Sequence, residues 1–298
     1  GETAAGDDLE VALRCEAEAD AMLAEERTDA AAEWFERALT LRLHALGPGD
    51  PSLTHVAEML ARTANHAASM KLRGGPTGAA SLQEVERCLK STLDLLNRVR
   101  TGVGRGSRSV IRAALAPCFN LTLSNLAALQ QRLGNTQAAL VWLREAQALC
   151  GVLPPADAAA THLSLCALLS HLGRHSEAEH HASEAVRLGE EDIMQLDTLQ
   201  QPSGDGVDAA AMLNDKASAL AVAYNNLAVQ REFLGQASEC LALYEKAVVL
   251  AEGHMDPGNP LVSRLRDSHR NALQTHRRAA GMGGPLPPVR QPPLAAKE

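Results

Sequence analysis

The sequence predicts an all-α protein built as an α-solenoid of about five helical hairpins and a C-terminal capping helix. Of its 298 residues, 53 are Ala and 45 are Leu, whereas Val and Ile together number 18. Ala and Leu favour helices, and strands need more β-branched residues than this. Related segments also recur along the chain at the spacing of paired helices. These observations exclude an all-β or an α/β fold.

Composition and charge narrow the class of partner. Hydrophobic residues make up 46% of the chain and charged residues 21%, as in folded proteins that have a core. The chain has only two Trp, two Tyr and three Phe, too few to stack on the bases of a nucleic acid. The net charge of −8 also opposes attraction to nucleic acid or to anionic lipid. We expect neither a nucleic acid nor a membrane as partner.

The six cysteines are scattered and form no C-x-x-C pair. Each lies within an apolar helical pattern, as a small hydrophobic residue would, so we expect reduced thiols and a cytoplasmic location. The longest uncharged stretch, residues 113–131, is long enough to span a bilayer, but it contains Pro117 and several polar residues. We interpret this stretch as a buried helix.

The first repeated pattern is a joint between consecutive hairpins. Residues 35–39 match residues 244–248, and the same offset of 209 positions aligns residues 48–51 with residues 257–260. The offset is close to five units of about 42 residues, a length suited to a pair of helices. In each copy an Asp or Asn stands before a Pro, where it can cap the next helix while the Pro occupies the first turn.

The second pattern marks the turn inside each hairpin, where a Gly is followed twelve residues later by a small Ala. The Gly permits the turn, and the Ala lets the second helix approach the first closely. Two units depart from this pattern. Glu26 stands at the Gly position of the first unit, and Gly74 of the second is followed by Cys88 only after fourteen residues, which suggests an insertion near residues 75–77. The regular pairs are Gly134 with Ala146, Gly173 with Ala185, and Gly235 with Ala247.

These patterns predict eleven helices, which form five hairpins and a cap. The helices are expected at residues 7–26, 29–46, 51–72, 79–100, 108–133, 135–150, 155–172, 174–198, 208–233, 236–252 and 260–280. The hairpins would span residues 7–50, 51–101, 108–151, 155–200 and 208–253, so that residues 1–280 form one solenoid. Residues 281–298 are rich in Pro and are expected to be a disordered tail.

Several of these segments resemble tetratricopeptide repeats, in particular the variety of about 42 residues found in kinesin light chains. The resemblance rests on the Leu-Gly pairs at 133–134 and 234–235, on the Asn-Asn-Leu-Ala segment at 225–228, and on the joint at 36–51. Where that subtype usually has a His before the Pro, this chain has Asp or Asn. The resemblance covers about residues 7–280 and implies a right-handed solenoid that binds other proteins. It does not specify the partner, because many unrelated scaffolds use this repeat.

A polar residue recurs nine positions before each hairpin Gly. In the resembling family this position faces a concave groove, where an amide can bond the backbone of an extended peptide. The alternative is that these side chains bond neighbouring helices within the solenoid, and the two roles are compatible. The residues are Asn65, Asn125, Ser164 and Asn226.

Other side chains lie one or two turns away on the same helix faces and are candidate selectors of a ligand's side chains. The arginines among them would favour an acidic ligand through charge-assisted hydrogen bonds. For each residue taken alone, a solvated surface position is the simpler interpretation. The candidates are Arg62, Gln130, Arg132, His171, Gln230 and Phe233.

Positive charge is most concentrated in residues 97–112, which contain five arginines, three glycines and no acid. This basic loop suits contact with an acidic peptide, a phosphate or a tubulin tail, and a solvated connector is the alternative. A nucleotide site is not expected, because the pattern G-x-x-x-x-G-K-[ST] is absent. The arginines are Arg98, Arg100, Arg105, Arg108 and Arg112.

Neither metal binding nor catalysis is indicated. His171, His175, His180 and His181 crowd one hairpin, but no Cys accompanies them at ligand spacing. No G-x-S-x-G or H-E-x-x-H pattern is present, and acidic runs such as residues 190–192 are interpreted as surface. We therefore expect no enzyme, no cofactor and no bound metal.

Together these patterns predict a non-catalytic scaffold or adaptor that binds an extended or helical segment, with an acidic one favoured. The resemblance to kinesin light chains favours a motor-adaptor, ciliary or other cytoskeletal assembly. The segment from Pro285 to Arg290 fits P-x-x-P-x-R, which suits an SH3-type domain, and a linker is the alternative. The rival to the adaptor is a repeat sensor domain of a larger signalling ATPase or transcriptional regulator.

Overall fold

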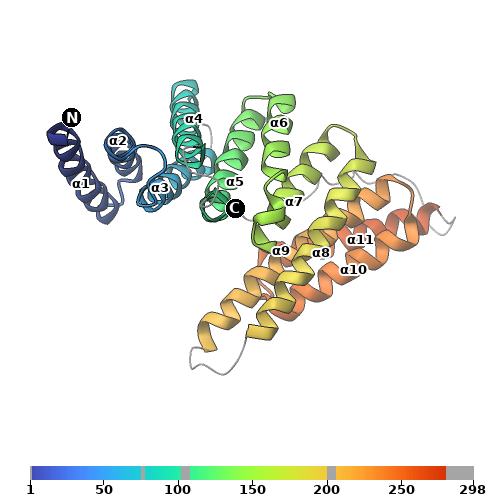
Figure 1. Cartoon of the computed structure of the whole chain (residues 1–298). Coiled ribbons are helices and arrows are strands. Elements are labelled where there is room, and N and C mark those ends of the chain that lie inside the picture. The colour runs from blue at the N-terminus through green and yellow to red at the C-terminus, as the bar shows by residue number, and fades with distance from the viewer. Residues whose placement is uncertain (1, 75–77, 102–107, 200–205, 280–298) are drawn as a thin grey trace. The chain divides into compact units, whose positions relative to one another are not determined.

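The computed structural model describes residues 2–74, 78–101, 108–199 and 206–279. This part of the chain consists of eleven α-helices and one short 3-10 helix, with no strand (Figure 1). It divides into two compact units, Gly1–Leu153 (unit 1) and Pro154–Glu298 (unit 2). The expected all-α fold is confirmed. A single solenoid over residues 1–280 stays a prediction, and the expected tail at 281–298 lies outside the described residues.

Each unit is a series of helical hairpins. In unit 1, α1 packs on α2, α3 on α4, and α5 on α6, and α3 also contacts α5. In unit 2, α7 packs on α8 and α9 on α10, and α11 covers α10. Unit 1 comprises α1 (Glu2–Ala24), α2 (Thr28–Leu46), α3 (Leu53–Arg73), α4 (Ala79–Thr101), α5 (Arg108–Arg132), α6 (Thr136–Gln147) and the 3-10 helix η1 (Cys150–Val152). Unit 2 comprises α7 (Pro155–His171), α8 (His175–Leu199), α9 (Gly206–Phe233), α10 (Ala237–His254) and α11 (Pro260–Ala279).

These bounds match the eleven expected helices, with two differences of several residues. Helix α1 begins at Glu2 rather than at residue 7, because one exposed Gly at position 6 weakens a helix by only about 1 kcal/mol. Helix α6 ends at Gln147 rather than at residue 150, and the chain then turns through η1. Gly151 and the Pro at position 154 both disfavour continuation of an α-helix there.

The hairpin turns are built around one residue in the left-handed conformation. Gly134, Gly173 and Gly235 have φ values of 78°, 71° and 78°. In each turn the amide after the Gly bonds a carbonyl five residues earlier in the chain, as Asn135 bonds Gln130 at 2.8 Å. This is the Schellman arrangement that ends many helices. The Ala twelve residues after each Gly is fully buried, so the expected hairpin pattern is confirmed.

The first hairpin makes the same turn without a Gly. Glu26 has a φ of 59°, and the next amide, that of Arg27, bonds the carbonyl of Met22 at 2.8 Å. The second hairpin does not: Gly74 has a φ of −70°. The insertion suggested near residues 75–77 lies outside the described residues.

At the joints between hairpins the expected Asp and Asn bond the backbone ahead of the next helix, although α3 begins only at Leu53, after Pro51. Asp50 accepts hydrogen bonds from the amide and the hydroxyl of Ser52, at 2.8 and 2.6 Å. Asn259 accepts one from the amide of Leu261 at 2.9 Å, directly before α11 begins at Pro260. The hydrogen bonds from Ser52 lower the pKa of Asp50, since they favour the carboxylate.

The larger core cluster of unit 1 consists mainly of Leu and Ala side chains and includes Leu60, Leu96 and Phe119. A second cluster includes Leu89 and Leu126. Trp34 and Trp142 are partly buried and pack against the larger cluster. At the surface of the first hairpin, Arg42 of α2 forms a half-buried ion pair with Glu16 of α1.

The centre of unit 2 is helix α9, which contacts α7, α8 and α10. Residues 220–230 of α9 are all buried, including Asn225, Asn226 and Gln230. A helix that is buried on every side lacks a polar face. Its sequence therefore shows no clear amphipathic period, although its bounds are as expected.

The turn at Glu26 yields a stability prediction. A non-Gly residue in the left-handed region costs about 1 to 2 kcal/mol, and Gly escapes that cost. We expect Glu26→Gly to raise the free energy of unfolding by about 1 kcal/mol. The matched control is Glu18→Gly, at an exposed position inside α1, which should lower it by about 1 kcal/mol. Urea unfolding followed by circular dichroism measures both, and a loss of stability in Glu26→Gly would contradict the turn assignment.

Candidate functional site

Two of the predicted groove amides link neighbouring helices of unit 1. Asn65 of α3 donates to the carbonyl of Ala61 and to the hydroxyl of Thr122 of α5, both at 2.8 Å. Asn125 of α5 donates to the side-chain and backbone oxygens of Asn65, at 3.0 and 3.2 Å. Both amides are 1% exposed. The structure thus places them in the structural role that the sequence left open.

The equivalent residues of unit 2 do not repeat this link. The hydroxyl of Ser164 donates to the carbonyl of Ala160 in its own helix, at 3.0 Å. Asn226 is completely buried, and its neighbour Asn225 is only 1% exposed. Binding of a ligand backbone by Asn65, Asn125, Ser164 and Asn226 stays a prediction, and for the three amides it would require the helices around them to separate.

The predicted side-chain selectors fall into two groups. Arg62, Arg132 and His171 are exposed, and the guanidinium of Arg132 donates to the carbonyl of Leu72. The other three make contacts within the protein. Gln130 lies within 3.4 Å of Glu86 and bonds Asn135, Gln230 bonds His175 at 3.0 Å, and the ring of Phe233 stacks on that of His175 with centroids 4.0 Å apart.

The basic loop is only partly described. Arg98 is exposed at the end of α4, whereas Arg100 is half-buried, 4.9 Å above the ring of Phe119, and donates to Asn97. Arg105 lies outside the described residues, as does the segment from Pro285 to Arg290. Arg108 and Arg112 belong to α5, and their side chains are likewise outside the description.

A buried histidine pair that the sequence did not reveal joins α7 and α8. The Nδ1 atoms of His162 in α7 and His181 in α8 are 3.0 Å apart, and both side chains are largely buried. His162 lies nineteen residues before its partner and outside the noted cluster. Among the described residues, no group of three or more His, Cys, Asp or Glu is placed to hold a metal ion.

Burial holds the thiols of Cys88, Cys118 and Cys240 in their protonated form. Cys240 of α10 lies 3.2 Å from the imidazole Nε2 of His276, an arrangement that resembles a nucleophile beside a base. Burial nevertheless raises the pKa of Cys240 to about 11, and raises that of Cys88 and Cys118 to a similar value. A thiol with such a pKa supplies little thiolate at neutral pH. All six cysteines are free.

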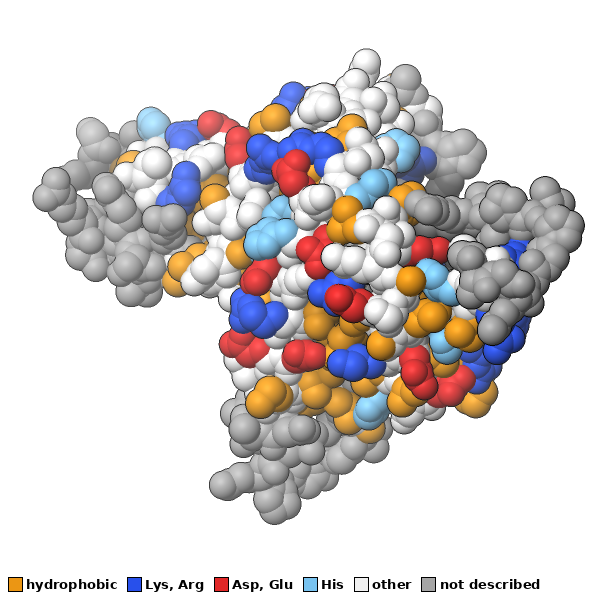
Figure 2. All heavy atoms as spheres, turned by 90° about the vertical axis from the view of Figure 1, so that its right-hand side faces the viewer, with side chains coloured by type: hydrophobic (Ala, Val, Ile, Leu, Met, Phe, Trp, Pro, Cys, Tyr) orange, Lys and Arg blue, Asp and Glu red, His pale blue; other side chains and the backbone are white. Residues whose placement is uncertain are grey.

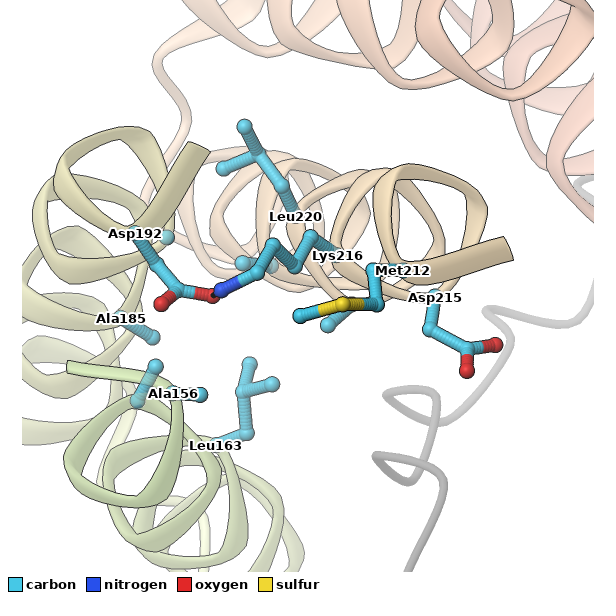
Figure 3. A pocket seen from close by; sticks show the side chains of 12 residues that line it. Ala156, Leu163, Ala185, Asp192, Met212, Asp215, Lys216 and Leu220 are labelled. Atoms are coloured by element: carbon cyan, nitrogen blue, oxygen red, sulfur yellow. Dashed lines mark ion pairs between the residues drawn. The ribbon is translucent and has the colours of Figure 1, made fainter. Parts of the chain in front are cut away.

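An opening suited to a ligand lies in unit 2, between α7, α8 and α9. We call it the α7–α9 pocket, and its volume is about 320 Å³. Small side chains create this space, and Gly189 brings α8 so close to α9 that a Cβ there would lie 3.1 Å from Leu220. Figure 3 shows side chains from all three helices facing the space. The lining consists of Ala156, Ala159, Leu163, Ala185, Gly189, Asp192, Met212, Asp215, Lys216, Ala219, Leu220 and Ala223.

Charge in the α7–α9 pocket is confined to three of its lining residues. Asp192 of α8 and Lys216 of α9 form an ion pair at 2.5 Å, with side chains only 11% and 21% exposed (Figure 3). Asp215 is exposed on the next position of α9. Asp157, in the first turn of α7, has its pKa raised by burial and by the charge of Asp192. Carboxylates therefore outnumber cations at this site.

Asp192 corrects one interpretation of the sequence. It ends the acidic run at residues 190–192, which was taken as surface, yet Asp192 is 8% exposed and paired with Lys216. A run of like charges on a helix spreads around its circumference, so one member can face the interior while its neighbours face solvent. Asp192 and Lys216 stand 24 positions apart, and no pattern in the sequence indicates that they pair.

On the face of the molecule drawn in Figure 2, hydrophobic side chains gather among charged side chains of both signs. Exposed apolar residues of unit 2 include Met212, at the pocket, and Met194. Within the described residues, no helix is both long and apolar enough to cross a membrane.

The amide link between α3 and α5 can be tested by mutation. Asn125→Ala leaves the buried Oδ1 of Asn65 without its donor, so the free energy of unfolding should fall by about 1 to 3 kcal/mol. Adding Asn65→Ala should cost less than the sum of the single changes, because the two residues act on one link. Urea unfolding of the two single variants and the double variant measures this, and additive losses would contradict the link.

The buried histidine pair predicts a pH dependence of stability. Burial lowers the pKa of His162 below its usual 6.5, and His180 and Arg187 add to this while Glu184 opposes it. The unfolded chain therefore takes up a proton more readily, and the free energy of unfolding should fall as the pH drops below about 6.5. In His162→Asn, which keeps a polar partner for His181, the fall should be smaller. Urea unfolding between pH 5 and 8 gives the slope of the free energy of unfolding against pH for the native chain and for His162→Asn. Equal slopes for the two proteins would contradict the prediction.

Comparison with known proteins supports the fold and goes no further. Neither the models of known families nor the curated proteins compared with this sequence match it. The crystal structure of BtubC (BKLC) from P. vanneervenii is similar, with a TM-score of 0.50 over 92% of this chain and 98% of that chain. The two sequences are 16% identical over this match. The fold of this chain is thus an all-α repeat of the tetratricopeptide type, as its hairpin turns had indicated.

Proposed function

We propose that this chain is a non-catalytic interaction scaffold that binds a peptide segment of another protein. The observation that carries the proposal is the α7–α9 pocket, an apolar opening between the first helices of two consecutive hairpins. Repeat folds use the surfaces between adjacent first helices to hold extended or helical segments.

The chemistry of the pocket supports binding rather than turnover. Nine of its twelve lining residues are Ala, Gly, Leu or Met, and the three charged ones include a mutually neutralising pair. Such a site suits an apolar side chain, with few polar groups to orient it. Met212, which is 51% exposed, adds an adaptable apolar rim.

The finer parts of the proposal rest on sequence patterns and on the resemblance to kinesin light chains. They are an acidic ligand for the exposed arginines of unit 1, an SH3-type partner for the segment after Pro285, and a place in a cytoskeletal, motor-adaptor or ciliary assembly. No described contact favours the alternative of a sensor domain in a larger ATPase or transcriptional regulator. Peptide binding is the part that the pocket makes testable.

A display library of random twelve-residue peptides, selected on the full chain, tests the proposal. Ala219 lines the pocket and is exposed, so Ala219→Leu should fill the opening without disturbing the core. Burial of one large apolar side chain stabilises by about 1.5 to 3 kcal/mol. Selected peptides should therefore bind Ala219→Leu about 10- to 100-fold more weakly.

The matched control is Ala242→Leu, the same change at an exposed position of α10 away from the pocket lining. It should leave the affinity unchanged, and circular dichroism should show both variants folded. Failure to enrich any peptide, or equal binding to the two variants, would refute the proposed function.

A further inference from the structure

We propose that the α7–α9 pocket selects a segment in which a large apolar side chain stands beside a Lys or Arg. The apolar side chain enters the space between α7, α8 and α9, and the cation meets the carboxylate of Asp215 at its rim. This inference rests on the proposed peptide binding and names the chemistry of the partner. It differs from the acidic ligand that the arginines of the sequence suggested.

The space accepts an apolar group because its walls are small and its polar atoms are engaged. Leu163 and Leu220, 2% and 5% exposed, belong to the core, and Ala side chains fill much of the remaining wall. The Lys216 ammonium and the Asp192 carboxylate bond each other at 2.5 Å, so neither needs a ligand. A buried charge that is already paired gains little from a further polar contact.

The charge that remains is negative. With Lys216 committed to Asp192, the exposed carboxylate of Asp215 has no ion pair within the described residues. In Figure 3, Asp215 lies beyond Met212, on the far side from Asp192 and at the edge of the lining. A ligand cation there gains an attractive contact, whereas a ligand carboxylate meets like charge.

A second carboxylate adds to the negative potential. Asp157 of α7 neighbours the lining residue Ala156 and lies close enough to Asp192 for that charge to raise its pKa. The burial of Asp157 raises its pKa most, and repulsion from the charge of Asp192 raises it further. Asp157 and Asp192 lie at the end of the pocket away from Asp215, so they act on a cation at Asp215 only through longer-range attraction.

The peptides selected on the full chain test this inference. We expect them to place a Lys or Arg within two positions of a large apolar residue. The same selection on Asp215→Asn should lose the preference for a basic residue, whereas Glu245→Gln, which removes one exposed charge of α10 away from the pocket lining, should keep it.

Fluorescence polarisation then compares one selected peptide with its Arg→Gln or Lys→Gln analogue. The loss of the cation should weaken binding about two- to fivefold to the native chain and less than twofold to Asp215→Asn, as expected for an exposed ion pair. High salt should narrow the difference.

The outcomes separate the two proposals. Peptides that require an open pocket, as judged by Ala219→Leu, but are acidic or show no charge preference would overturn this inference and leave the proposed function intact. A basic preference that persists in Asp215→Asn would overturn it as well. Failure to enrich any peptide would remove both proposals.

Discussion

The structure depends on the close approach of two helices across each hairpin turn. In every described hairpin but the second, that approach combines a residue in the left-handed conformation at the turn with a small residue twelve positions later. Gly134, Gly173 and Gly235 meet the first condition, and a fully buried Ala meets the second in each case. Because the same constraint recurs, the chain repeats one helical hairpin. Each hairpin can bury its apolar face only against the neighbouring hairpins. Glu26 shows that the constraint is conformational, since this turn forms without a Gly.

Polar groups at the contact between successive hairpins follow from this packing. The position nine residues before the turn falls between adjacent first helices, so an amide there is buried and must find a partner. Asn65 and Asn125 satisfy each other and Thr122 across the contact of α3 and α5. At the matching place in unit 2, Ser164 turns back onto its own helix. The polar residues at this position therefore join two helices in unit 1, whereas Ser164 in unit 2 bonds only within its own helix.

The α7–α9 pocket has the same origin. Small residues let α8 approach α9 closely at Gly189, while the side chains of α7 are too short to fill the space that remains. Packing that depends on Ala and Gly thus leaves unfilled volume where three helices diverge. An ion pair at one side and an exposed carboxylate at the other give this volume a polarity that apolar packing alone does not provide.

The sequence by itself determined the helices, their pairing and the hairpin turns, because these follow from local propensity and from contacts at short, regular spacing. It also identified the capping roles of Asp50 and Asn259. Only the tertiary structure decided which polar residues are buried. Asn65 with Asn125, His162 with His181 and Asp192 with Lys216 are joined across separate helices. The spacing of such pairs is set by how two helices slide and rotate against each other, and a helical period does not encode that relation. For this reason the sequence placed the candidate site on a ladder of amides, whereas the structure placed it in a pocket lined by small residues that no pattern had singled out.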